Sequence, residues 1–67
     1  MSIIKVIEVL ATSEKSFEDA TKNALKEASK SVKNINSIYV KEMNAKVSDN
    51  EIISYGVNAK VSFEVID

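Results

Sequence analysis

Residues able to perform acid–base or nucleophilic chemistry are few in this sequence. Its 67 residues include no His and no Cys, so a general base would have to be a carboxylate or a Lys. Glu8, Glu42 and Glu64 fall in segments expected to be strands, and strand geometry alone does not indicate which pair would converge. A glycine-rich phosphate loop is excluded because Gly56 is the only glycine. The sequence therefore predicts a protein that is not an enzyme.

Two polar groups could bind ions instead. The segment 48–51 (Ser-Asp-Asn-Glu) offers oxygen ligands for Ca²⁺ or Mg²⁺, but it lacks the spacing and glycine of an EF-hand and is more typical of a turn. A basic row with helical spacing could hold phosphate groups, although it is more typical of a solvated helix face. Its members are Lys22, Lys26, Lys30 and Lys33.

Gly56 interrupts a segment of strand character on its polar side. Glycine inside a strand costs stability, so its presence needs a reason. One reason would be the close approach of a ligand or of another backbone. The other would be a bend that lets a long strand curl round a helix. The sequence leaves both open.

Strands and one helix must position these residues. Residues 2–10 are rich in β-branched side chains and predict a strand. A helix is expected over about 17–33, because Ser16 is a good N-cap and Asp19 follows three residues later. One apolar stripe runs along this helix at helical period, and it comprises Phe17, Ala20, Ala24, Leu25, Ala28 and Val32.

The second half of the chain predicts a hairpin. Residues 35–47 form the first strand, and 48–50 form the turn. Residues 53–65 alternate apolar and polar without a break, which indicates a strand with one buried face. The expected fold is α+β, in the order β-α-β-β, with a three-stranded antiparallel sheet wrapped around the helix in a single domain, residues 1–67.

The expected lengths predict assembly. A strand over 51–65 would span roughly 50 Å, whereas a helix over 17–33 covers about 25 Å. The surplus apolar face must bend round the helix, meet another subunit, or both. Without Cys or His, disulfides and the usual metal sites cannot stabilise so small a chain, so oligomerisation is expected.

The charge balance and the N-terminus limit the other partners and the location. Nine basic and ten acidic residues give a net charge of −1, which predicts no general attraction to nucleic acid or to a membrane. The N-terminus lacks the cationic start and apolar core of a signal peptide, so a cytoplasmic location is expected.

The chain as a whole resembles the dodecin family. The segment 12–17 (Thr-Ser-Glu-Lys-Ser-Phe) is similar to the family's Thr-Ser-Glu-Glu-Ser-Phe before the helix. The Ala-rich helix and 40–42 (Val-Lys-Glu) also match, and so do the aromatic and β-branched positions of the last strand, Tyr55, Val57, Val61 and Phe63. The resemblance implies twelve protomers in a hollow shell of cubic symmetry, without enzymatic activity. It also implies binding of flavins such as riboflavin or FMN in pockets between subunits, as a buffer or store.

The resemblance also implies a ligand site, and this sequence departs from it at two positions. In the family, a Trp on the second strand stacks on the flavin ring, and a Gln after a Tyr on the third strand hydrogen-bonds its polar edge. Here Ser37 stands at the Trp position and Gly56, after Tyr55, at the Gln position, while the acidic residue is kept as Glu42. The predicted site is Ser37, Gly56, Asn36, Ile38, Glu42 and Tyr55.

Three hypotheses follow for the function. In the first, a shell of subunits binds FMN, riboflavin or another small molecule. In the second, a structural shell without flavin holds divalent cations at subunit junctions through residues such as Glu14, Glu42, Asp49 and Glu51. In the third, the chain is an unrelated small α+β interaction module.

Overall fold

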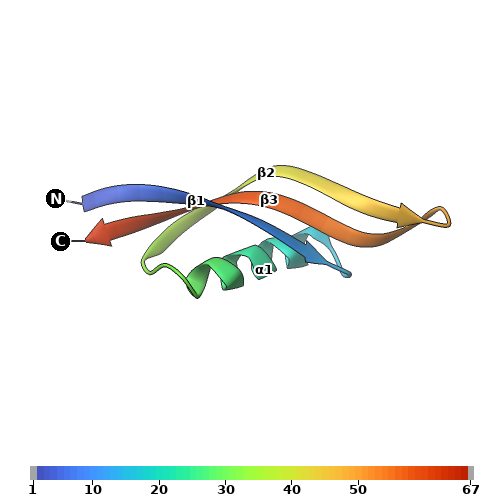
Figure 1. The fold of residues 1–67 in the computed structure, drawn as a ribbon, viewed down its shortest axis with the longest axis horizontal. Helices are drawn as coiled ribbons and strands as arrows, with labels where there is room; N and C mark the ends of the chain where they lie inside the picture. The colour runs from blue at the N-terminus through green and yellow to red at the C-terminus, as the bar shows by residue number, and fades with distance from the viewer. Residues whose placement is uncertain (1, 67) are drawn as a thin grey trace.

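Three strands and one helix make up the protomer. The computed structural model describes residues 2–66, which form β1 (Ser2–Ser13), α1 (Phe17–Ser29), β2 (Ile35–Ser48) and β3 (Glu51–Ile66). The sheet order is β1-β3-β2, and both outer strands run antiparallel to β3. The helix lies against one face of the sheet (Figure 1). The predicted β-α-β-β order and antiparallel sheet are therefore confirmed.

The start of α1 is fixed by side-chain hydrogen bonds. The Ser16 hydroxyl accepts a hydrogen bond from the backbone N–H of Asp19 at 2.9 Å, as its predicted N-cap role requires. The buried Ser13 hydroxyl donates to Asp19 Oδ2 at 2.6 Å, which ties the end of β1 to the first turn of the helix. The strand itself extends to Ser13 rather than stopping at residue 10, and Ser13 pairs with Tyr55 of β3.

The end of α1 corrects the prediction. The helix stops at Ser29 instead of continuing to residue 33. The backbone N–H of Val32 turns back to the carbonyl of Ala28 at 3.0 Å, and Asn34 adopts a left-handed φ of 61°. Asn tolerates this conformation better than most residues. The chain leaves the helix early because it must reverse into β2 within a few residues.

The core is small and consists of short side chains. On α1 the buried residues are alanines, whereas Leu25 of the predicted stripe is 40% exposed and lies outside the core. Because the helix presents Ala, it can approach β3 closely. The largest fully buried side chain is Val61. The buried hydrophobic residues are Ala20, Ala24, Ala28, Val57, Ala59 and Val61.

The β2–β3 hairpin extends beyond the helix (Figure 1). Its two turn residues, Asp49 and Asn50, have φ values of 51° and 63°, as favoured two-residue hairpins require. Phe17, the first residue of α1, packs its ring on Tyr55. Residues 46–54, which form the part of the hairpin beyond Tyr55, therefore extend past the start of the helix. We call residues 46–54 the arm.

Much apolar surface stays uncovered in one protomer. The protomer measures 53 × 18 × 14 Å, whereas a helix of 13 residues is only about 20 Å long. The predicted mismatch between strand and helix lengths is thus confirmed. The large apolar side chains left exposed are Ile3, Ile4, Val6, Leu10, Leu25, Tyr39, Met43, Val47, Ile52, Ile53 and Ile66.

Candidate ligand-binding site

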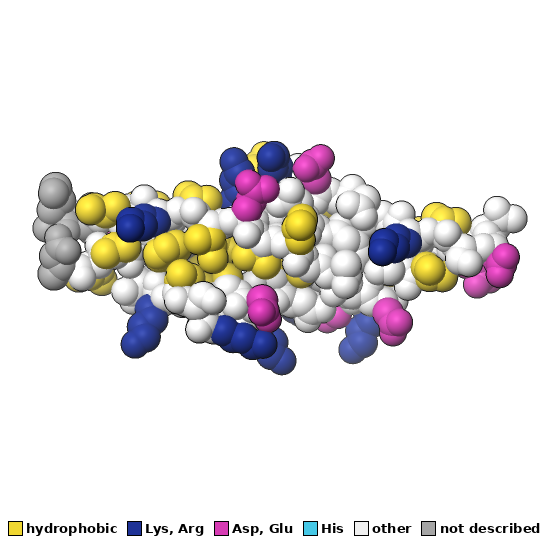
Figure 2. Space-filling model, in the orientation of Figure 1, with side chains coloured by type: hydrophobic (Ala, Val, Ile, Leu, Met, Phe, Trp, Pro, Cys, Tyr) yellow, Lys and Arg dark blue, Asp and Glu magenta, His cyan; other side chains and the backbone are white. Residues whose placement is uncertain are grey.

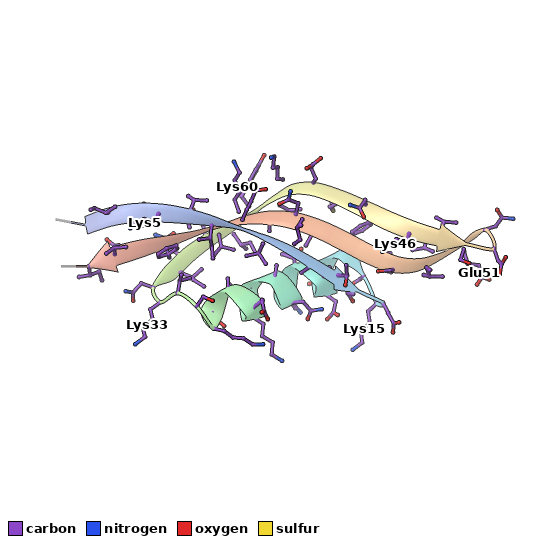
Figure 3. The ribbon with its side chains drawn as sticks, in the orientation of Figure 1. Lys5, Lys15, Lys33, Lys46, Glu51 and Lys60 are labelled. Atoms are coloured by element: carbon purple, nitrogen blue, oxygen red, sulfur yellow. The ribbon has the colours of Figure 1, made fainter. Side chains whose placement is uncertain are left out.

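The face of the sheet that points away from α1, here called the outer face, carries most of the polar residues of β3. Alternate residues of a strand point to opposite faces, and Val57, Ala59 and Val61 are buried on the helix side. The residues between them therefore belong to the outer face, and Figure 3 shows Lys60 on the side away from the helix. On β3 the outer face comprises Ser54, Gly56, Asn58, Lys60 and Ser62.

The neighbouring strands complete this face through their register. On β1 the partners of the outer β3 residues are Thr12, Leu10, Glu8 and Val6. On β2 the partners are Lys46, Asn44, Glu42, Tyr39 and Ser37. The outer face is thus a mixture of amides, hydroxyls, charges and exposed apolar groups.

A register irregularity in β2 decides which of its residues reach the outer face. Ser37 and Tyr39 pair with Ser62 and Lys60, so they share one face, as the spacing of two predicts. Between Val40 and Glu42 the register shifts by one residue. From Glu42 to Lys46 the even-numbered residues face outward, and the register shifts again between Lys46 and Val47. These shifts explain why the sequence alternation of β2 is imperfect.

The structure separates the six predicted site residues into two groups. Ser37, Glu42 and Gly56 lie on the outer face, and Asn36 lies at the irregularity before Ser37. Ile38 packs against the core on the helix side. Tyr55 does the same, since its ring meets Phe17 at a centroid distance of 5.0 Å and an angle of 77°.

Ser37 and Gly56 are not brought together within one protomer. Ser37 pairs with Ser62, and Ser62 is six residues from Gly56 along β3. That separation is about 20 Å in an extended strand. No pocket is found anywhere in the described part of the protomer. A ligand shorter than this separation therefore cannot contact both positions on one protomer.

Residues that the sequence did not single out flank Gly56. Asn44 and Thr12 are its partners on β2 and β1, and Asn58 follows two positions along β3. The Asn58 Oδ1 atom is buried and has no hydrogen-bond partner. Predicting Asn44 at this place would have required the position of the β2 irregularity, which the pattern of residues does not reveal.

The acidic residues considered for cations do not converge in one protomer. Asp49 and Glu51 lie at the tip of the arm, Glu42 lies along β2, and Glu14 precedes the helix. Residues 2–66 contain no group of three or more potential metal ligands. Within the same range no helix is long and apolar enough to cross a membrane.

Solved structures of similar proteins share this fold. The dodecin from Streptomyces davaonensis superposes with a TM-score of 0.92 at 24% identity, covering 98% of this chain and 97% of its own. A point mutant of the Thermus thermophilus dodecin gives 0.92 at 27% identity, with 100% of both chains covered. The calcium dodecin from Mycobacterium tuberculosis, described as calcium chelating with a novel calcium-binding site, gives 0.81 at 33% identity, covering 96% of this chain and 91% of its own.

Sequence similarity to known proteins is found at the level of the family. No curated protein matches the chain. Residues 3–66, however, match the family model of the dodecins, which is nearly the whole length of the chain. With the β-α-β-β fold and the sheet register described above, this match leads to one conclusion. The chain belongs to the dodecin family.

Proposed function

We propose that this protein is a non-enzymatic, cytoplasmic homo-oligomer of twelve copies that binds a small molecule between its subunits. Riboflavin or FMN is the ligand that the family resemblance favours. In this proposal the protein stores or buffers its ligand, and no nucleic acid or membrane is a partner. The observation that carries the proposal is the wide separation of Ser37 and Gly56 on a protomer without a pocket.

Uncovered apolar surface supports the assembly. Figure 2 shows hydrophobic side chains gathered at the left end of the molecule, where β1 begins and β3 ends, and more of them on the arm at the right. Burial of one such side chain contributes about 1.5–3 kcal/mol. A core whose largest fully buried residue is Val61 leaves much of the stability to contacts between copies.

Tyr39 is the aromatic residue that the outer face offers beside Ser37. Its side chain is 64% exposed, and it lies two residues from Ser37 on the same face. Aromatic stacking contributes about 0.5–1.5 kcal/mol beyond buried area. We therefore assign ring stacking to Tyr39 in a chain that has no Trp.

Equilibrium dialysis of the intact protein against riboflavin and FMN tests the proposed function. We expect saturable uptake by the wild type and an affinity about 2- to 12-fold lower for Tyr39→Leu, because Leu keeps apolar contact but cannot stack. Fluorescence quenching is less suitable, since a quenching Trp is absent. No saturable uptake of either flavin by the wild type would contradict the flavin proposal.

A second candidate function is binding of a divalent cation at subunit junctions. It is supported by the 33% identity to a dodecin described as calcium chelating. Asp49 and Glu51 lie at the exposed tip of the arm, where a neighbouring copy could add ligands.

Thermal unfolding with and without calcium tests this candidate. If Ca²⁺ binds only the folded assembly, saturation at about 100 times the dissociation constant stabilises it by about 2.7 kcal/mol. We expect the melting temperature to rise with CaCl₂, to return to its starting value with chelator, and to respond less in Asp49→Asn. Identical melting with CaCl₂ and with chelator would count against cation binding.

A further inference from the structure

Gly56 is not required by its backbone conformation. The φ angle of Gly56 is not positive, so other residues could adopt the same backbone conformation. The residue is buried in the middle strand, between Thr12 of β1 and Asn44 of β2. The reason for glycine therefore lies in what covers this position.

The Asn44 side chain covers Gly56. A Cβ atom built on Gly56 would lie 2.9 Å from Asn44 Oδ1 and 3.5 Å from Asn44 Cγ. The carboxamide of Asn44 thus occupies the space that a side chain at position 56 would fill. Asn44 is exposed, so this amide is also part of the surface.

The amides beside Gly56 have free hydrogen-bonding capacity. Among the side-chain hydrogen bonds of residues 2–66, none involves Asn44. Asn58, two residues from Gly56 on the same face, has a buried Oδ1 without a partner. A carboxamide offers two donors and one acceptor. A buried acceptor left without a donor is unfavourable, so the Asn58 amide gains if it turns toward a donor on a ligand.

The surroundings of these amides favour an uncharged ligand edge. Glu42 and Lys46 lie on the outer face at equal spacing on either side of Asn44. Their charges have opposite signs, so they offset each other at Asn44. Leu10, which pairs with Asn58, is 79% exposed and provides apolar surface beside the amides. A flat ring with a polar edge would use both kinds of surface.

We propose that the Asn44 carboxamide, lying over Gly56, determines which ligand the outer face accepts, and that it selects an uncharged ring edge with a hydrogen-bond donor beside an acceptor. Asn44 then presents from β2 the polar group that Gly56 cannot present from β3. This inference rests on the small-molecule function proposed above and names the residue that sets its specificity. The imide edge of riboflavin, an N–H between two carbonyl groups, has the required chemistry.

The test compares riboflavin with 3-methylriboflavin, which lacks the imide N–H, by equilibrium dialysis of the assembled protein. The wild type is expected to prefer riboflavin by about tenfold, and Asn44→Ala is expected to lose that preference. Gly56→Ala should act in the same way, because its methyl group would displace the flexible Asn44 amide without disturbing the backbone.

The double variant and a control make the comparison specific. If both substitutions act through one amide, Asn44→Ala with Gly56→Ala should lower riboflavin affinity no further than the stronger single variant. Ser31→Ala, at an exposed position in the turn after α1 and away from the outer face, should stay within twofold of the wild type.

The possible outcomes separate this inference from the proposed function. Loss of preference in both single variants, without further loss in the double variant, supports the role of Asn44. Riboflavin uptake that is unchanged in Asn44→Ala, or losses that multiply in the double variant, overturn this inference and leave the flavin-binding function standing. No uptake by the wild type overturns the flavin proposal and, with it, this inference.

Discussion

Replacing Val47 with Glu and Ile52 with Lys is expected to break the assembly into smaller species. The two residues face each other across the arm and are 63% and 54% exposed in the protomer. If neighbouring copies bury them, each side chain contributes about 1.5–3 kcal/mol per protomer, and the loss is repeated in every subunit. The opposite charges preserve cross-strand pairing, and the net charge does not change.

Light scattering coupled to gel filtration measures this effect. Twelve copies of the 7.4 kDa chain would give about 89 kDa for the wild type, and the variant should give a small fraction of that mass. Leu25→Lys is a suitable control, because it also replaces an exposed apolar side chain with a charge, but on α1 rather than on the arm. This variant should keep the mass of the wild type. A variant that keeps the wild-type mass would show that the arm is not an assembly contact.

The second large effect is expected from Ala24→Leu. Ala24 is fully buried, and the core beside it is formed by Val57 and Ala59. A larger side chain there must push α1 away from the sheet, and overpacking of this kind costs about 1–3 kcal/mol or more. At 4–8 °C per kcal/mol for a chain of this size, the melting temperature should fall by about 5–20 °C.

Lys26→Leu is the matched control for this substitution. It introduces the same side chain two residues away, at an exposed position of α1. Ala, Lys and Leu have similar helix propensities, so propensity does not separate the two variants. Loss of the Lys26 charge from the last turn should cost less than overpacking of the core. Melting should be compared at one protein concentration, because the proposed assembly would make the melting temperature concentration-dependent. Equal stability of the two variants would mean that the contact between helix and sheet is looser than the structure indicates.

The fold was predictable wherever local pattern and tertiary need agree. The N-cap at Ser16 and the hairpin turn at Asp49 and Asn50 depend on short-range hydrogen bonds and backbone preferences, so their residue types are informative. The end of α1 was not predictable in this way. Residues up to 33 suit a helix, but the chain must turn at Asn34 to reach the sheet.

The candidate site was less predictable than the fold. The alternation of β3 identifies its two faces, but the irregularity between Val40 and Glu42 changes which residues of β2 face outward. Asn44 therefore lies over Gly56 because of this register shift. The shift depends on the pairing of β2 with β3 and so cannot be read from the sequence of β2 alone. Close approach of the Asn44 side chain adds a third explanation for Gly56 to the two that the sequence left open.

The choice of candidate residues from the family pattern has a similar limit. Ile38 and Tyr55 are near Ser37 and Gly56 in sequence, yet alternation places them on the helix side. Residues two positions apart, such as Tyr39 and Ser37, share a face. The assembly proposed above would depend on contacts between protomers, which no local pattern in the sequence encodes.

The most direct test of a ligand site shared between copies is riboflavin uptake by assembled and dissociated protein. Equilibrium dialysis at equal protomer concentration should compare the wild type with the Val47→Glu/Ile52→Lys variant, whose mass and circular dichroism are measured in parallel. We predict saturable uptake by the assembled wild type and none by the variant when it is dissociated but still folded. Equal uptake per protomer by the dissociated, folded variant would contradict the account, because the site would then lie within a single protomer.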